Sequence, residues 1–123
     1  MIQINRLHQF IDDHRESAFS KIFLYAKSIN GKFLTLNQRS AKMAGAEIKE
    51  IIGKSDTDLC WSQYADEYRR NDLDCIQSQK TILCQEKLLT WDNKNFFEIS
   101  LKTPLVNKNN HIVGIAGMSF ISK

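Results

Sequence analysis

The sequence predicts a single α+β domain built on a mainly antiparallel sheet. The chain has 123 residues, which is the usual size of one domain. Strand-forming residues gather in two groups, over 21–37 and 81–121, and the segment between the groups has helical periodicity. Strands at both ends of a chain form one sheet when the two groups pair, and the helices between them then cover a face of that sheet.

A helix is predicted over residues 3–16, ahead of the sheet. Its apolar side chains recur at three- and four-residue steps, with polar residues on the other side. So narrow an apolar stripe needs a surface to cover it, which is either the chain's own domain or a second copy of the chain. We divide the chain into a flanking helix, 1–19, and a domain, 20–123. The homodimer contact predicted for the helix comprises Ile4, Leu7, Phe10 and Ile11.

Two strands joined by a tight turn come next. Asn30 and Gly31 lie between the strand-like segments 21–28 and 33–37. Both residue types accept the positive φ of a type I′ turn, which matches the twist of paired strands. This dipeptide therefore predicts an antiparallel hairpin.

The middle of the chain predicts three helices. Two short ones cover 38–44 and 46–52, and a longer one extends over 62–78. Gly45 and Gly53 end the short helices, because glycine accepts the left-handed conformation that follows many helices.

Three strands close the predicted domain, over 81–90, 96–106 and 112–121. Apolar and polar side chains alternate in the second strand, which gives that strand two different faces. Its apolar face, taken here as the inward one, contains Phe97, Ile99 and Leu101. Small residues in the third strand indicate that another group packs close against it: Gly114, Ala116 and Gly117.

Three stretches of the chain, in this order, resemble the PAS family of sensor domains. They are residues 30–37 (NGKFLTLN), 43–45 with 50–59 (MAG and EIIGKSDTDL), and 102–105 with 112–119 (KTPL and IVGIAGMS). The resemblance covers residues 20–121. It implies a five-stranded antiparallel sheet in the order 2-1-5-4-3, with helices over one face. It also implies a module that detects a signal or forms dimers, and that acts on an attached output domain.

The end of the chain departs from the family pattern. Many relatives carry Asp-Ile-Thr where the output linker begins, and here the last residues are 119–123 (SFISK). The connection to an output domain is therefore open. We expect the chain to be part of a longer regulator with its output domain on the C-terminal side. Such a regulator is either a transcriptional regulator or a histidine kinase of a two-component system.

Two cofactors of the family do not match these residues. In the flavin-binding light sensors, an adduct-forming cysteine follows the second helix; its place falls on Asp56, and Cys60 lies four residues later. Haem-binding relatives use a histidine on the long helix, and residues 62–78 contain none. We predict neither a flavin adduct nor a His-ligated haem. No metal site is predicted either, because no cysteine and histidine have zinc-ligand spacing, and Asp56 and Asp58 are assigned to turn caps.

An unidentified small metabolite is the ligand that remains, with a core filled by side chains as the alternative. Pockets for such ligands are mostly apolar with a few polar groups. Asp72 lies on the apolar face of the long helix, so it needs a partner, a water molecule or a shifted pKa. The predicted ligand-binding residues are Leu36, Tyr64, Tyr68, Asp72, Phe97, Ile99, Leu101 and Met118.

A sensing and dimerisation module is favoured over two other classes of protein. No nucleophile with a base beside it and no phosphate-binding loop is found, so we expect no enzyme; the alternative is a small α+β enzyme with Asp72 as a buried general base. The lysines are scattered, so we expect no direct binding of nucleic acid. No apolar run reaches the length of a membrane span and no signal peptide is found, so we expect a cytoplasmic protein.

Overall fold

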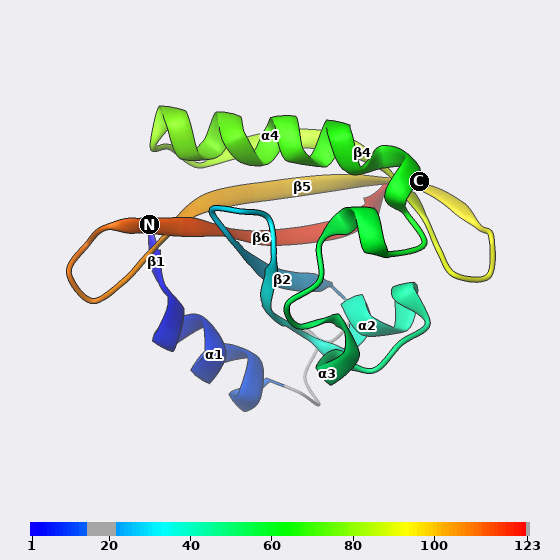
Figure 1. Cartoon of the computed structure of the whole chain (residues 1–123), viewed down its shortest axis with the longest axis horizontal. Coiled ribbons are helices and arrows are strands. Elements are labelled where there is room, and N and C mark those ends of the chain that lie inside the picture. The colour runs from blue at the N-terminus through cyan, green and yellow to red at the C-terminus, as the bar shows by residue number, and fades with distance from the viewer. Residues whose placement is uncertain (15–21, 123) are drawn as a thin grey trace.

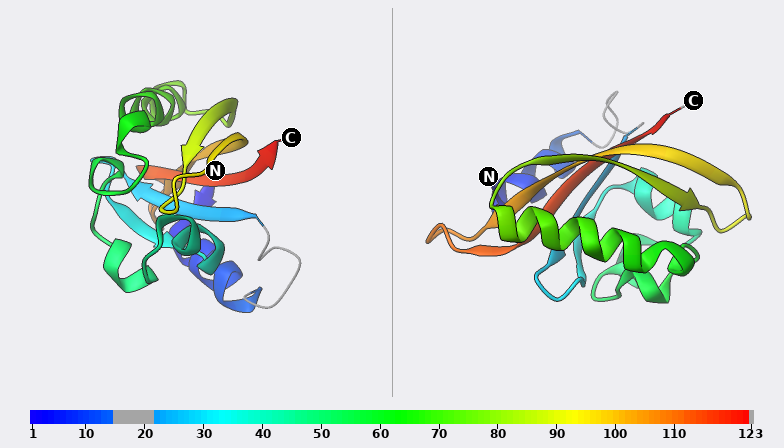
Figure 2. Two further views of the ribbon diagram at one scale, coloured as in Figure 1. Left: turned by 90° about the vertical axis from the view of Figure 1, so that its right-hand side faces the viewer. Right: turned by 90° about the horizontal axis from the view of Figure 1, so that it is seen from above.

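The structure is a computed structural model that describes residues 1–14 and 22–122. Within these residues it has one sheet of six strands. The strands are β1 (Ile2–Gln3), β2 (Phe23–Ser28), β3 (Phe33–Leu36), β4 (Ile82–Leu89), β5 (Asn95–Val106) and β6 (Ile112–Ser122). The helices are α1 (Ile4–Asp13), α2 (Gln38–Ala44), α3 (Ile48–Ile51), the 3₁₀ turns η2 (Asp56–Asp58) and η3 (Ser62–Tyr64), and α4 (Ala65–Ser78). Helices α1 and α4 lie on opposite sides of the sheet (Figure 1, Figure 2).

The antiparallel strands lie in the order β3-β2-β6-β5-β4, so the two groups from the ends of the chain pair through β2 and β6. Counted from β2, this is the predicted order 2-1-5-4-3. The sheet differs from the prediction in its sixth strand, β1, which pairs in parallel with β5 and places Ile2 opposite Leu105. Two residues show no alternation, so the sequence contains no sign of β1.

The predicted hairpin turn joins β2 to β3. Gly31 has a φ of 83°, and the Ser28 amide donates to the Lys32 carbonyl oxygen at 2.8 Å. Asn30 does not have a positive φ, so the expected type I′ conformation is wrong although the hairpin is confirmed. Gly45 ends α2 with a φ of 68°, in the left-handed conformation expected of it. Gly31 and Gly45 therefore have the left-handed conformation that the sequence predicts for them.

Helix boundaries differ more from the prediction. The segment expected as a helix over 46–52 contains α3, of only four residues. The long helix begins as the 3₁₀ turn η3 before α4 starts. Helix α1 is shorter than the predicted 3–16, because Gln3 belongs to β1 and His14 follows the last helical residue, Asp13. Residues 15 and 16 lie outside the described residues, as do the start of the strand at 21 and the domain boundary at 19–20.

Both faces of the sheet carry an apolar core. On one face, side chains of α2, α3 and α4 pack on the strands. On the other face, Leu7 and Ile11 of α1 are buried against the sheet, while Ile4 and Phe10 are half-buried. Two of the four predicted dimer contacts are thus covered by the chain's own domain, which is the alternative that the sequence left open.

The two faces of β5 are oriented opposite to the prediction. The polar side chains of Glu98 and Lys102 face the α4 side and are buried there. The apolar face belongs to the α1 side, where Leu105 lies in the core under α1 and Phe97 is 51% exposed. Helix α1 covers only one end of this face, so apolar side chains at the other end remain in contact with solvent.

Candidate ligand-binding pocket

A cavity of about 50 Å³ lies between the sheet and the helices of the α4 side. A space of this size holds a few water molecules or one small chemical group. Most of its wall is apolar or aromatic: Phe23, Tyr25, Phe33, Leu36, Met43, Trp61, Tyr68 and Leu88. The rest is polar: Lys27, Ser40, Asp56, Glu86, Glu98, Lys102 and Ser119.

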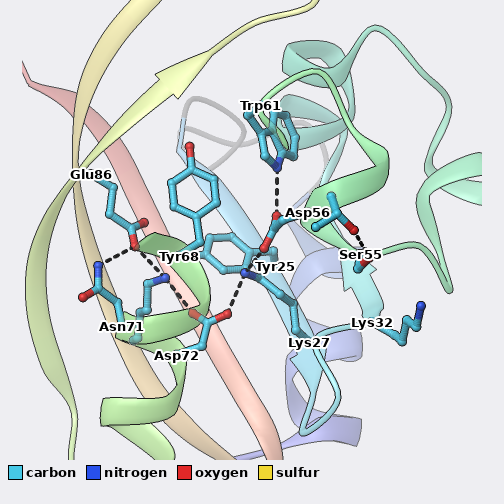
Figure 3. A network of polar contacts seen from close by, with 12 residues as sticks. Tyr25, Lys27, Lys32, Ser55, Asp56, Trp61, Tyr68, Asn71, Asp72 and Glu86 are labelled. Atoms are coloured by element: carbon cyan, nitrogen blue, oxygen red, sulfur yellow. Dashed lines mark hydrogen bonds and ion pairs between the residues drawn. The ribbon is translucent and has the colours of Figure 1, made fainter. Parts of the chain in front are cut away.

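Two buried lysines and Asp72 form the centre of an ionic network beside this cavity (Figure 3). Lys27 comes from β2 and Lys102 from β5, and their exposed fractions are 3% and 1%. Asp72 of α4 binds both, because Lys27 Nζ lies 2.7 Å from Oδ2 and Lys102 Nζ lies 2.7 Å from Oδ1. The carboxylate therefore connects the helix to two strands that are not neighbours in the sheet.

The network extends to a second acid at each end. Lys27 Nζ also lies 2.6 Å from Asp56 Oδ2, and the Trp61 indole donates to the other oxygen of Asp56 at 2.8 Å. At the opposite end, Lys102 Nζ lies 2.8 Å from Glu86 Oε2. Further donors to Glu86 are Asn71 Nδ2 at 2.9 Å and Ser100 Oγ at 3.2 Å.

These contacts decide the charges of the central groups. Burial by itself would raise the pKa of Asp72, but Lys27 and Lys102 outweigh burial and hold that pKa below its ordinary value. Burial would lower the pKa of Lys27, and Asp56 and Asp72 instead raise it. The pKa of Lys102 is also raised, against its burial, by Tyr25, Asp72 and Glu86. At neutral pH Asp72 is therefore an anion and both lysines are cations.

Glu98 lies in the same cavity wall and has a different environment. It is 7% exposed, and its direct cross-strand neighbour is Glu86. Among the described residues, no group forms a hydrogen bond or ion pair with the Glu98 carboxyl group, although the Glu98 backbone belongs to the sheet. Burial, and after it the nearby charge of Glu86, raises the pKa of Glu98 from 4.5 to about 8. Glu98 is therefore mostly protonated at neutral pH.

The predicted ligand-binding residues fall into three groups: two line the cavity, two lie on the α4 side without lining it, and four lie on the other face of the sheet. Leu36 and Tyr68 line the cavity, and Tyr68 donates its hydroxyl to the Lys87 carbonyl oxygen. Asp72 is not part of the wall but holds the two lysines that are. Tyr64 lies away from the cavity, and its hydroxyl donates to Asn95 Oδ1 at 3.3 Å.

The third group lies on the wrong side of the sheet. Phe97, Ile99, Leu101 and Met118 do not line the cavity, and Met118 packs in the core under α1. The prediction took the apolar face of β5 as the inward one. In the structure, buried charges on the other face neutralise one another, so a polar face is directed inward.

Several residues of the site were assigned to other roles by the sequence. Lys27 and Lys102 were counted among scattered surface lysines, and Asp56 was taken as a turn cap. Asp58 does cap a turn, because it accepts the Ser55 amide at 3.0 Å. One signal pointed to part of the site: Glu98, Ser100 and Lys102 recur at two-residue steps, which places them on one face of a strand.

None of the described residues that line the cavity is a cysteine or a histidine. Asp56, at the position that corresponds to the flavin-linked cysteine, is held by Lys27 and Trp61 and offers no thiol. Over the described ranges, His, Cys, Asp and Glu side chains form no group that could hold a metal ion. Nor does any helix in those ranges have the length and apolar character needed to cross a membrane.

Comparisons with known proteins agree on the fold. A family model described as PAS fold matches residues 20–119. The structure of the Vibrio cholerae VqmA dimer without target DNA has a TM-score of 0.80 at 17% identity, covering 98% of this chain and 52% of that one. VqmA bound to DPO has a TM-score of 0.79 at 17% identity, covering 97% and 57%. A PAS domain from Colwellia psychrerythraea has a TM-score of 0.72 at 14% identity, covering 97% and 96%.

The chain spans about half the length of the VqmA chains that it matches. No protein of curated function matches it in sequence. At such low identities the structural likeness shows the fold alone. The family model, in contrast, matches most of the sequence, from residue 20 to residue 119. With the sheet order and the helical layer described above, this match shows that the chain belongs to the PAS family.

Proposed function

We propose that this PAS domain is the sensing module of a larger regulatory protein and that it binds a small molecule in the cavity beside Asp72. The observation that carries the proposal is the network of buried charged groups in and beside the wall of a cavity that side chains leave unfilled. Buried ion pairs contribute less stability than apolar residues of the same volume. A core that served packing alone would therefore not need buried ion pairs. A mostly apolar pocket with a few polar groups is, in contrast, typical of ligand sites.

The ionic network offers a route from the pocket to the rest of the domain. Asp72 belongs to α4, and its partners Lys27 and Lys102 belong to β2 and β5. A ligand that competes for one of these contacts would change how α4 is held on the sheet. Such a local change is the kind of event that biases a two-state regulator.

We propose that the intact protein carries an output domain on the C-terminal side of this PAS domain. VqmA has been seen in a complex with ligand and DNA. That likeness favours a transcriptional regulator over a histidine kinase as the intact protein. The cytoplasmic location expected from the sequence stays a prediction.

We also propose that the domain forms a homodimer through α1 and the uncovered part of the sheet next to it. Leu83, Phe97 and Phe120 are 69%, 51% and 42% exposed. All three belong to the α1 side of the sheet, since Leu83 pairs with Leu101 and Phe120 with Ile99. A second copy of the chain would cover these apolar side chains.

The alternative of an enzyme with Asp72 as general base has little support in this site. A base must be free to accept a proton, and its pKa should lie near the working pH. Both oxygens of Asp72 accept from lysine ammonium groups, and its pKa is lowered. We therefore propose no catalytic role for it.

A screen of metabolites tests the proposed function. We expect at least one compound to raise the melting temperature of the protein and to appear as a one-to-one complex in native mass spectrometry. In Leu88→Phe, a larger side chain fills the cavity wall and the complex should be lost. Ile52→Phe, at an exposed aliphatic residue that belongs neither to the cavity wall nor to the proposed dimer surface, is the matched control and should bind as the wild type does. A screen without any hit would favour the filled-core alternative.

A further inference from the structure

Glu98 differs from every other polar side chain that the structure describes in the cavity wall. Lys27, Lys102, Asp56 and Glu86 all have partners within the ionic network. Ser40 and Ser119 form hydrogen bonds within the protein as well. Glu98 is buried to more than nine-tenths, lines the cavity and has no such partner. It is therefore the group whose hydrogen-bonding capacity is left for a molecule in the cavity.

The charges around the cavity do not balance. The described groups in and next to its wall include two lysines, Lys27 and Lys102, against four carboxyl groups: Asp56, Asp72, Glu86 and Glu98. An excess of acid remains even when Glu98 is protonated. In a site of low dielectric constant, this excess attracts a cation and repels an anion.

Resting on the proposed function, we propose that the pocket selects small apolar molecules that carry a protonated amine, and that Glu98 is the group that binds this amine. The ammonium group would meet Glu98 on β5 and lie near Glu86, its neighbour on β4. An ammonium ion placed there supplies the positive charge that Glu98 lacks, since Glu86 already binds Lys102. A carboxylate in the same position would face like charges.

The proposal has a consequence for protons. Glu98 is mostly protonated in the free protein at pH 7, because its pKa is raised to about 8. An ammonium ligand keeps its own proton and pairs with the carboxylate, so the proton of Glu98 passes to solvent. Binding should therefore release close to one proton at pH 7 and should strengthen as the pH rises toward 8. A neutral ligand that accepts a hydrogen bond from Glu98 would release none.

Several charged or titratable groups face Glu98 and enter this pH dependence. They are Glu86 on β4, Lys102 on β5, Lys27 on β2, Asp56 on η2 and Tyr68 on α4. Lys27 is held as a cation by its acids, and Tyr68 has a raised pKa. Among the groups that surround the cavity, Glu98 is therefore the one expected to change its charge between pH 6 and pH 8.

Ligands of matched shape test the inference. Because the cavity is small, the set is isobutylamine, isobutanol and isobutyrate. We expect the amine to bind the wild-type chain at least ten times more tightly than the matching alcohol, and the carboxylate not to bind. Calorimetry in buffers of different ionisation enthalpy measures the proton release, and thermal shifts at pH 6, 7 and 8 measure the pH dependence.

Glu98→Gln keeps the shape and hydrogen-bonding capacity of the side chain but removes the charge. It should weaken amine binding at least tenfold and leave the binding of a neutral ligand unchanged. Glu67→Gln, at a glutamate outside the cavity wall, is the control and should match the wild type. The calorimetric and pH measurements use the wild-type chain, so they stand whether or not Glu98→Gln folds.

Each failure has a distinct meaning. The inference is overturned if an alcohol or carboxylate binds as tightly as the amine, if amine binding releases no proton, or if Glu98→Gln binds the amine normally. It is also overturned if no amine binds while the metabolite screen yields neutral or anionic ligands; in these cases the proposed sensing function stands. If neither amines nor the screen yield a ligand, the proposed function fails together with the inference.

Discussion

Two buried carboxyl groups of this domain have opposite charge states, and their neighbours explain the difference. Asp72 lies between the ammonium groups of Lys27 and Lys102, and its pKa is lowered although it is buried. Glu98 lies across from another glutamate, and its pKa is raised. Burial disfavours the charged form in both cases, so the sign of the neighbouring charge decides the outcome.

The raised pKa of Glu98 predicts how the stability depends on pH. In the unfolded chain Glu98 loses its proton near its ordinary pKa of 4.5, whereas in the folded chain it keeps the proton up to about pH 8. Its contribution to stability is therefore complete below pH 4.5 and is lost as the pH rises to about 8. The slope contributed by this residue reaches at most about 1.4 kcal/mol per pH unit.

Urea unfolding of wild type and Glu98→Gln at pH 5, 6, 7 and 8 measures this contribution. The variant has no such proton to lose. The free energy of unfolding of the variant, relative to that of the wild type, should therefore increase with each step in pH. A constant difference between the two proteins across this range would contradict the assignment.

Removal of one lysine tests the ionic network. Lys102→Met leaves Asp72 and Glu86 without a buried cation, so we expect a loss of about 3–5 kcal/mol in the free energy of unfolding. The control is Lys108→Met at an exposed turn, where the change should stay within about 0.5 kcal/mol. Urea unfolding at pH 7 measures both. A loss of less than about 1 kcal/mol for Lys102→Met would contradict the network as drawn.

At the scale of single elements, β6 shows why small residues were predicted to have close neighbours. A Cβ atom on Gly114 would lie 1.9 Å from the Lys27 carbonyl oxygen, and one on Gly117 would lie 2.2 Å from the ring of Tyr25. The first contact is with backbone and the second with a side chain. Because Gly117 has no side chain, the Tyr25 ring can occupy its place in the cavity wall.

These two glycines lead to a ranked prediction. Gly114→Ala must displace the backbone of β2, whereas Gly117→Ala can be accommodated by a shift of the Tyr25 ring. We expect Gly117→Ala to cost about 1–3 kcal/mol, which is typical of overpacking, and Gly114→Ala to cost more. Thermal or urea unfolding of the two variants gives the order, and an equal or reversed order would contradict it.

Strand β5 shows what the alternation of apolar and polar residues can and cannot predict. The pattern from Phe97 to Lys102 correctly separates an apolar from a polar face. It does not say which face the helices cover. That depends on partners that lie far along the chain, such as Asp72 for Lys102, and these partners make a polar inner face stable. Four predicted pocket residues were misplaced for this reason.

At the scale of the whole molecule, the proposed dimer follows from a sheet that is covered on only part of its α1 side. The exposed apolar side chains Leu83, Phe97 and Phe120 lie beyond the reach of α1. We expect light scattering to give twice the chain mass of 14.2 kDa for the wild type. A chain that starts near residue 20, and the double variant Phe97→Asp with Phe120→Asp, should both be monomers.

A control for the dimer prediction is Lys108→Asp with Asn109→Asp, in the exposed turn between β5 and β6. It introduces charge away from the apolar surface and should remain a dimer. Unchanged dimers in both altered proteins, or a monomeric wild type, would rule out this interface.

The order of elements, the hairpin at Asn30 and Gly31 and the antiparallel sheet were determined by the sequence itself. Each rests on local physics: the φ that a turn residue accepts, the period of an apolar stripe, or the room that glycine leaves. The meeting of Lys27, Asp56, Asp72, Lys102 and Glu86, and the solitary position of Glu98, were decided only by the tertiary structure. Charges from five separate segments can enter a core only together, because each is too costly to bury without the others.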